Sequence, residues 1–229
     1  MRSSGPDIAP FYAGEINRRA AALTRAGHSI IAMHLGQPTR GPSEATIAAA
    51  NRALVSAPNG YWESHELKQR LAEHYREWYG VEVAPERFIL TNGASAALVG
   101  VFASMFATGE RIALARPGYP AYRNTLTALG RIPVELDCGP ASRYRLTAPV
   151  LAALDPAPHG VVVASPANPT GTMLDAADLQ ALADECKRRD IVLISDEIYH
   201  GVTYRGRSVS ALEITQDVIV INSFSKCCH

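Results

Sequence analysis

The segment that decides the fold is G-V-V-V-A-S (residues 160–165), followed by D-L-Q-A-L-A-D-E-C-K-R-R-D (178–190) and I-V-L-I-S (191–195). The two flanking runs are short and rich in β-branched residues, which is typical of strands covered on both faces. Between them, apolar residues recur at the i, i+3, i+4, i+7 spacing of one helix face: Leu179, Leu182, Ala183 and Cys186. A helix between two buried strands is a βαβ unit, so the segment predicts a mostly parallel sheet.

Similar apolar runs recur on both sides of this segment. They predict further strands at R-F-I-L-T (87–91), R-I-A-L-A (111–115), I-P-V-E-L (132–136) and D-V-I-V-I-N (217–222). Helical spacing and end signals predict helices at residues 8–27, 43–56 and 66–79, with Ser43 as an N-cap and Gly27 and Gly80 as ends. The predicted fold class is therefore α/β, with a mostly parallel sheet and helices on both faces.

Bulk composition describes an ordinary globular protein. The 229 residues are 47% hydrophobic, and 22 Lys and Arg balance 22 Asp and Glu, so the formal net charge is zero. A balanced charge without a basic run argues against nucleic acid and against an anionic membrane surface as partners. No apolar run is long enough to span a membrane, and the opening M-R-S-S-G-P does not resemble a signal peptide.

Cysteine usage predicts reduced thiols and no metal site. Cys138, Cys186, Cys227 and Cys228 lack C-x-x-C spacing, so a cytoplasmic location is expected. A metal-binding tail ending in His229 is not expected, because no further ligand stands at zinc-site spacing.

Ligands of open parallel sheets bind beyond the carboxyl ends of the strands, so the residues after each apolar run are the candidates for a site. After F-I-L, the small residues Gly93, Ala94 and Ser95 open an apolar helix, and free N–H groups there suit a phosphate. Ordinary N-capping is the alternative. After I-A-L-A, the turn R-P-G-Y-P-A-Y fixes Tyr119, which could stack on a flat ring or simply pack in the core.

Three more strand ends carry polar groups. Asn168 lies between two prolines in P-A-N-P-T-G, where it either presents its amide or only shapes a turn. Asp196 begins D-E-I-Y-H and needs a cationic or hydrogen-bonding partner if it is buried, which an arginine of this chain could provide. Lys226 in S-F-S-K is either a desolvated nucleophile for carbonyls or a surface charge.

Taken together, the strand ends supply a phosphate-binding turn, a stacking aromatic ring, an amide, a carboxylate, the phenol of Tyr199 in D-E-I-Y-H, and an amine. A phosphorylated pyridine aldehyde uses all of them: the amine forms a Schiff base, the carboxylate keeps the ring nitrogen protonated, and the amide and phenol bond the ring hydroxyl. The set therefore predicts pyridoxal 5′-phosphate (PLP) as the cofactor.

In their order and placement, N-P-T-G (168–171), D-E-I-Y (196–199) and S-F-S-K (223–226) resemble the class I/II aminotransferases, which are fold-type I enzymes dependent on PLP. The resemblance implies that Lys226 carries the cofactor, that Asp196 pairs with its ring nitrogen, and that Asn168 and Tyr199 bond its hydroxyl. The catalytic residues would be Lys226, Asp196 and Tyr199. Tyr119 would stack on the ring, and the phosphate would be held by Gly93, Ala94, Ser95, Ser223 and Ser225.

The resemblance also implies contacts beyond the cofactor ring. Gly36, in L-G-Q-P, and Asn168 would contact the substrate, and Tyr61 would reach the phosphate of a neighbouring subunit in a homodimer. The Pro/Gly-rich zone at residues 36–42 predicts a soft boundary. We therefore expect residues 1–42 to form an N-terminal arm with part of a small domain, and residues 43–229 to form the cofactor-binding large domain.

The sequence departs from the family after Lys226. Relatives continue with a segment of the type T-G-W-R and then most of the small domain, whereas this sequence has C-C-H. The strand that relatives place between the equivalents of residues 87–91 and 217–222 is then missing. We expect a large domain that is incomplete at its C-terminus, as in a fragment or a frameshift product.

The expected reaction is transfer of an amino group from an amino acid to a 2-oxo acid. One alternative keeps the cofactor but eliminates a β-substituent, as in a carbon–sulfur lyase. Another is that this polypeptide is an inactive remnant of an aminotransferase. Which amino acid and which 2-oxo acid are used is left open by the sequence.

Overall fold

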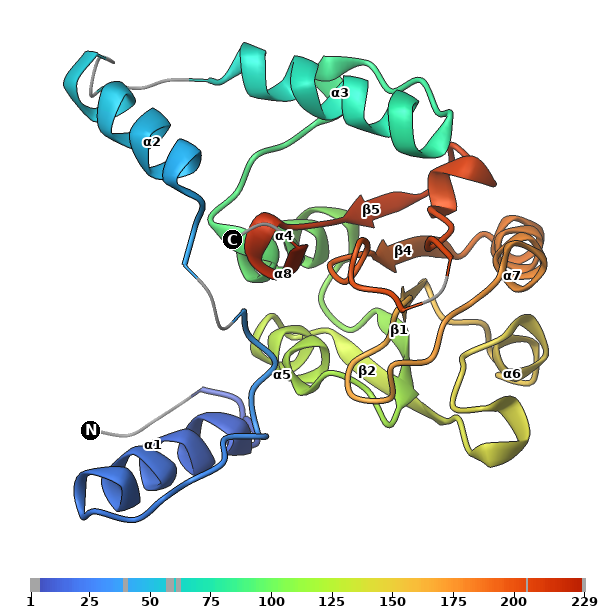
Figure 1. Ribbon diagram of the computed structural model, residues 1–229. Helices are drawn as coiled ribbons and strands as arrows, with labels where there is room; N and C mark the ends of the chain where they lie inside the picture. The colour runs from blue at the N-terminus through green and yellow to red at the C-terminus, as the bar shows by residue number, and fades with distance from the viewer. Residues whose placement is uncertain (1–4, 39–40, 57–59, 61–62, 205, 228–229) are drawn as a thin grey trace.

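The computed structural model describes residues 5–38, 41–56, 60, 63–204 and 206–227, and it is built around a five-stranded sheet (Figure 1). The strand order is β2-β1-β3-β4-β5, and each neighbouring pair is parallel. The strands are β1 (Arg111–Arg116), β2 (Ile132–Asp137), β3 (Gly160–Ala164), β4 (Val192–Asp196) and β5 (Ile219–Ile221). The prediction of a mostly parallel sheet is confirmed.

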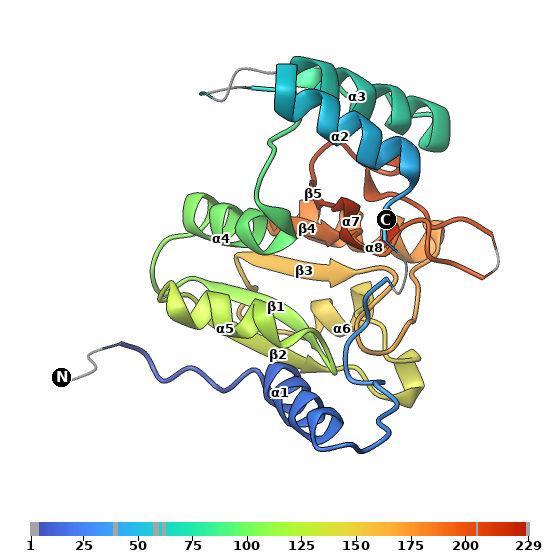
Figure 2. The ribbon, with the colours of Figure 1, turned by 60° about the vertical axis from the view of Figure 1, so that its left-hand side comes forward.

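Helices cover both faces of the sheet, as predicted (Figure 2). On one face, α4 (Gly93–Met105) and α5 (Pro120–Ala128) share a buried cluster with Val162 of β3. On the other face, α6 (Ala148–Ala152) and α7 (Ala176–Arg189) pack against Val161 and Val163. Because successive strand residues point to opposite faces, one continuous apolar run fills both cores.

The α7 crossover follows its predicted pattern closely. The four apolar residues of the predicted stripe are all buried: Leu179, Leu182, Ala183 and Cys186. Asp175 caps the start of α7, where its side chain accepts a hydrogen bond from the Asp178 amide at 2.9 Å. Asp190 ends the helix in the left-handed conformation, with φ of 54°.

The helices before the sheet differ in how much they bury. The third helix, α3 (His65–Tyr79), begins at an N-cap on Ser64 and ends at Gly80, and it packs Tyr75 and Tyr79 against Leu212 beside β5. In contrast, α1 (Tyr12–Arg25) and α2 (Glu44–Ser56) contain no buried residue. The segment before α1 reaches α5, where the Asn124 side chain donates to the Ala9 carbonyl at 3.0 Å.

Short helical turns complete the fold: η1 (Pro85–Arg87), η2 (Pro140–Ser142), η3 (Ala211–Glu213) and α8 (Phe224–Cys227). One prediction is wrong: residues 87–91, at the end of η1 and after it, do not form a strand. After the end of η1 they have no regular secondary structure, and Ile89 is 85% exposed. Apolar, β-branched composition makes a strand only where a neighbouring strand completes its hydrogen bonds, and none of the described residues does so here.

Other element boundaries shift by a few residues. The first helix was predicted over residues 8–27 but begins at Tyr12 and ends at Arg25, and the last strand is confined to Ile219–Ile221 within the predicted 217–222. Ser43 does accept a hydrogen bond from the Thr46 amide at 3.2 Å, as an N-cap does. None of the described helices is both long enough and apolar enough to cross a membrane.

The strand order also determines where a ligand can bind. The chain leaves β1 toward β2 on one side and later returns to β3 on the other side, so the topology switches between β1 and β3. Parallel sheets with this order bind ligands beyond the carboxyl ends of the strands near such a switch point. Asp196, the last residue of β4, lies at this edge of the sheet.

Candidate functional site

Asp196 is a carboxylate buried at the end of β4, with only 4% of its surface exposed. Its Oδ1 accepts the Ile198 amide at 3.1 Å, and its Oδ2 accepts the hydroxyl of Tyr122. Burial raises the pKa of Asp196 above its ordinary value, while these two hydrogen bonds act in the opposite direction. A buried carboxylate in this position is stabilised by any cation that binds beside it.

The alternative that an arginine of this chain neutralises Asp196 is wrong for the described residues. The groups that act on the carboxylate are a phenol and a backbone amide, and no cationic side chain of the described chain pairs with it. The donor set therefore suits a cationic group from outside the chain. A protonated pyridine nitrogen is such a group, so this observation fits the predicted cofactor.

Tyr122 is a site residue that the sequence analysis missed. It lies one helical turn after Tyr119 in α5, and the two rings meet edge to face with centroids 5.4 Å apart. Burial raises the pKa of the Tyr122 hydroxyl well above its ordinary value, and the neighbouring carboxylate adds to the shift. The available signal was the i, i+3 spacing of two tyrosines after a strand, which places both on one helix face.

Tyr119 occupies the N-cap position of α5, as expected for a ring held by the turn before a helix. The ring of Phe11 packs edge to face against that of Tyr119, with a centroid distance of 6.2 Å. Burial raises the pKa of Tyr119, and the charge of Asp196 raises it further. The ring is therefore close enough to the carboxylate to belong to one site with it.

Asn168 and Tyr199 come together, although 31 positions separate them. The Asn168 amide nitrogen donates to the Tyr199 hydroxyl at 3.3 Å. Burial is the main cause of a raised pKa for Tyr199, and Asp196 contributes to the shift. The amide and the phenol predicted to bond the same ring hydroxyl are thus direct neighbours.

Lys226 reaches the same region from α8. Its Nζ donates to the carbonyl of Gly36 at 2.8 Å and lies 5.9 Å from the centroid of the Tyr199 ring. The predicted cofactor lysine and the predicted substrate-contacting glycine are therefore in contact, across 190 positions of sequence.

The residues predicted to hold a phosphate lie at two places near the same edge. Gly93 opens α4 with φ of +78°, a conformation that favours glycine, and Ser95 is exposed on the first turn of this helix. Ser223 precedes α8, and its Oγ donates to the Ser225 Oγ at 3.0 Å. Helix α4 shares a core cluster with β5, and it ends at Met105, shortly before β1 begins at Arg111, so its start points toward the opposite edge, where β5 ends.

One predicted contact cannot be placed. Tyr61 lies outside the described residues, as do Cys228 and His229 of the chain end. Elsewhere in the described ranges, no group of three or more His, Cys, Asp or Glu side chains is arranged to hold a metal ion.

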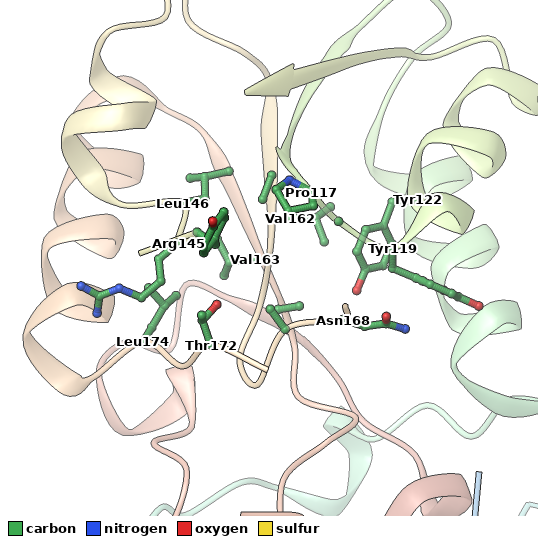
Figure 3. A pocket seen from close by; sticks show the side chains of 15 residues that line it. Pro117, Tyr119, Tyr122, Arg145, Leu146, Val162, Val163, Asn168, Thr172 and Leu174 are labelled. Atoms are coloured by element: carbon green, nitrogen blue, oxygen red, sulfur yellow. The ribbon is translucent and has the colours of Figure 1, made fainter. Parts of the chain in front are cut away.

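A small hollow adjoins the site at the ends of β1 and β3. Tyr119 and Asn168 line one side of it, while Arg145 and Leu146 line the other (Figure 3). Asp196, Tyr199 and Lys226 do not line this hollow. The carboxylate, the phenol and the amine therefore lie beside the cavity at the topological switch point, next to its tyrosine and asparagine wall.

A second buried cluster lies behind Asp196, and the sequence analysis missed it as well. Glu197, 1% exposed, accepts hydrogen bonds from the hydroxyls of Ser195 and Ser210 and from the Ala211 amide. His200, 4% exposed, lies between the Tyr79 hydroxyl and the Ser165 carbonyl. The signal in the sequence was an acidic residue and a histidine within D-E-I-Y-H, directly after a strand predicted to be buried.

Comparison with known proteins gives three concordant results. The family model for aminotransferase class I and II matches residues 29–228. A valine–pyruvate aminotransferase of Mycobacterium tuberculosis is 41% identical over 224 residues, which is 96% of this chain and 58% of that protein. The chain thus spans a little over half the length of this relative.

Solved structures agree with the sequence comparison. The crystal structure of an aminotransferase from Mycobacterium tuberculosis superposes with a TM-score of 0.93 at 41% identity, covering 96% of this chain and 58% of that one. The aspartate aminotransferase of Thermus thermophilus with maleate superposes with a TM-score of 0.89 at 29% identity, covering 96% and 59%.

Proposed function

This chain belongs to the class I and II aminotransferases, which depend on PLP, and we propose that it binds this cofactor through Lys226 and transfers an amino group from an amino acid to a 2-oxo acid. The observation that carries the proposal is the buried carboxylate of Asp196, which has a phenol and an amide as partners but no cation from the described chain. Tyr199 is close enough for the charge of Asp196 to raise its pKa, and Asn168 and Lys226 both approach Tyr199.

Each side chain has a role that its geometry supports. When bound, PLP supplies the electron sink that stabilises a carbanion of the amino acid. Asp196 holds the proton at the ring nitrogen, because its buried negative charge favours a cation there. Asn168 and Tyr199 orient the ring by hydrogen bonds to its hydroxyl, and the Lys226 amine moves the proton at the substrate α-carbon.

The remaining assignments follow the same arrangement. Tyr119 stacks on the ring, while Gly93, Ala94, Ser95, Ser223 and Ser225 hold the phosphate with backbone N–H groups and hydroxyls. Gly36 contacts the substrate, which is consistent with its carbonyl lying 2.8 Å from Lys226 Nζ. The positive φ of Gly93 explains why a glycine stands at this position, since a residue with a side chain would be strained there.

We infer the substrate class from the relative that is 41% identical. That protein is a valine–pyruvate aminotransferase, so an aliphatic amino acid with pyruvate as acceptor is the pair to test first. Neither alternative function gains support, because both the family and the relatives described above are named as aminotransferases.

We also propose a homodimer in the cytoplasm, with residues 1–42 as an arm and part of a small domain and residues 43–229 as the cofactor-binding domain. Two helices, α1 and α2, bury no residue within the described chain. In α2, the apolar residues Leu54 and Val55 are 72% and 90% exposed. A second subunit would cover such apolar surface. Cys138 and Cys186 are buried, and burial raises the pKa of both thiols, as suits a reducing compartment.

The proposal is tested by fixing the cofactor covalently. The sequence contains only three lysines, Lys68, Lys187 and Lys226, so mapping is unambiguous. After incubation with PLP and reduction with borohydride, the modified peptide is expected to contain Lys226. Lys226→Ala should abolish the modification, whereas Lys187→Ala, in the last turn of α7, should leave it unchanged.

Turnover then distinguishes the reaction type. With valine and pyruvate, formation of alanine is expected to depend on both substrates and to be lost in Lys226→Ala. Ammonia release without a 2-oxo acid would indicate elimination instead. Modification spread over all three lysines, or full turnover in Lys226→Ala, would contradict the assignment.

A further inference from the structure

His200 lies buried between two structural elements that are distant in sequence. Its Nε2 is 3.0 Å from the Ser165 carbonyl oxygen, and its Nδ1 is 2.8 Å from the Tyr79 hydroxyl in α3. A carbonyl oxygen only accepts hydrogen bonds, so Nε2 carries the proton. Burial lowers the pKa of His200 to about 4, so the ring is neutral and Nδ1 accepts from Tyr79.

Ser165 is the first residue of the loop that carries Asn168, and every polar group of Ser165 is engaged. Its amide donates to the Asp196 carbonyl at 3.2 Å, its Oγ accepts the Leu174 amide at 2.9 Å, and its carbonyl accepts from His200. The serine is 2% exposed. The imidazole is the one of these three partners that links the loop to α3.

The same imidazole fixes the other half of the site, because His200 directly follows Tyr199 in the chain. Tyr199 and Asn168 must stay within hydrogen-bond reach of each other, and their present distance is 3.3 Å. The hydrogen bond from the His200 ring to Ser165 therefore links the chain next to Tyr199 with the start of the loop that carries Asn168. A shift of this ring would change the separation of the two side chains.

Tyr79 is itself held in place on its other side. The guanidinium of Arg207 lies 5.5 Å from the centre of the Tyr79 ring and pairs with Glu213 at 2.7 Å. Glu197 faces His200 as well, with Oε2 3.5 Å from Nδ1. The hydroxyl of Tyr79 thus approaches Nδ1 from a ring that cannot turn freely.

We propose that His200 and Tyr79 are positioning residues for the cofactor site: the Tyr79 hydroxyl orients the imidazole, and the imidazole holds Ser165 so that Asn168 and Tyr199 meet at the ring hydroxyl. This inference rests on the proposed binding of PLP. Neither residue touches the cofactor, so both act through the loop of residues 165–172 and through Tyr199.

The first experiment needs no cofactor and measures amide hydrogen exchange in the full chain. Within the loop, the Leu174 amide donates to Ser165 Oγ and the Ala167 amide donates to the Thr172 carbonyl, both at 2.9 Å. Tyr79→Phe and His200→Leu should speed exchange at these two amides by about five- to tenfold, the effect of losing one buried hydrogen bond. His200→Gln should restore much of the protection, because its amide N–H can reach the Ser165 carbonyl. Tyr75→Phe removes a buried hydroxyl one turn earlier in α3 and should leave both amides unchanged.

The second experiment measures cofactor binding. We expect the dissociation constant for PLP to rise about five- to tenfold in Tyr79→Phe and His200→Leu. The absorbance of the bound cofactor should also titrate at higher pH, because hydrogen-bond donors to a ring oxygen favour its ionised form and these would be misplaced. A purely structural role would not move this titration. Far-UV circular dichroism checks that each variant is folded.

The outcomes separate this inference from the proposed function. If the wild type binds no PLP, the proposed function is wrong, while the exchange rates still decide whether His200 and Tyr79 hold the loop. If the wild type binds PLP and Tyr79→Phe matches it in exchange, affinity and titration, the positioning role is overturned. Equal acceleration in Tyr75→Phe would also overturn it, because the effect would then come from packing of α3.

Discussion

Glu197 and His200 lie 3.5 Å apart in the buried cluster behind the site, and burial shifts their pKa values in opposite directions. The pKa of Glu197 rises from an ordinary 4.5 to about 7, and that of His200 falls from 6.5 to about 4. Burial disfavours the charged form of either group, so both are largely neutral between about pH 4 and pH 7. The cluster therefore holds two titratable groups without requiring an ion pair.

This arrangement predicts compensating effects of pH on stability. Glu197 keeps its proton in the fold, so its contribution is fully present below about pH 4.5 and is lost as pH rises to about 7. His200 resists protonation in the fold, so its contribution is fully present above about pH 6.5 and is lost as pH falls to about 4. Between these pH limits, the two groups change the free energy of unfolding with pH in opposite directions.

Replacing one of the two groups should reveal the effect of the other on the pH dependence of stability. Relative to wild type, the free energy of unfolding of His200→Gln should fall as pH rises from about 4 to 6.5, and that of Glu197→Gln should rise from about pH 4.5 to 7. Urea denaturation at several pH values measures both differences. Parallel curves for wild type and variants would show that neither group changes its pKa on folding.

At the residue scale, the sequence predicts those site residues that follow strands, because parallel strands end at one edge. It does not predict partners that depend on how elements pack. Tyr122 reaches Asp196 across 74 positions, and Tyr79 reaches His200 across 121. No local pattern encodes such distances, so these two tyrosines required the structure.

Helix α7 shows what local sequence does encode. Its apolar stripe predicts the buried face, and Asp175 at the N-cap satisfies an amide that the helix itself cannot bond. Replacing Asp175 with Ala should lower the free energy of unfolding by about 1 kcal/mol. Asp175→Asn should cost much less, because asparagine is an equally good cap.

Urea denaturation of the two Asp175 variants provides the measurement. Equal destabilisation by Ala and Asn would mean that the charge near the helix start, rather than the hydrogen bond, provides the stability. Because the cap lies next to Leu174, whose amide binds Ser165, fraying at this end would also reach the loop of the site.

The segment of residues 87–91 shows where local sequence fails at the element scale. Its composition is that of a strand, yet a strand is defined by pairing with a neighbour, and the described residues provide none. The segment still contributes to the core on this side of the molecule, since Phe88, Val218 and Val220 of β5 and its approach pack against one buried cluster. Periodic helices were predicted well because their hydrogen bonds close within the element.

For the whole molecule, β5 is one of the two outer strands of the sheet, β2 being the other. Within the described chain, β5 pairs with β4 and with no other strand, while Ile89 nearby is 85% exposed. Exposed strand edges recruit further strands from other chains. We expect association of the 229-residue chain to continue beyond a dimer as its concentration rises.

Light scattering after size exclusion measures this association. Ile89→Lys should reduce the growth in mass, because a charge beside an edge opposes pairing. Ile31→Lys is the matched control, since Ile31 is 86% exposed but belongs to the segment after α1. Equal reduction by both variants would attribute association to general surface hydrophobicity instead.

The contact between Lys226 and Gly36 also bears on biosynthesis. Its two ends are 190 positions apart, so translation at about 5–20 residues per second separates their appearance by about ten to forty seconds. During that interval the ribosome has delivered the glycine, the asparagine loop and the aspartate, but not the reactive amine. The lysine follows directly after Ser223 and Ser225, so the reactive amine is the last of the predicted cofactor contacts to be synthesised.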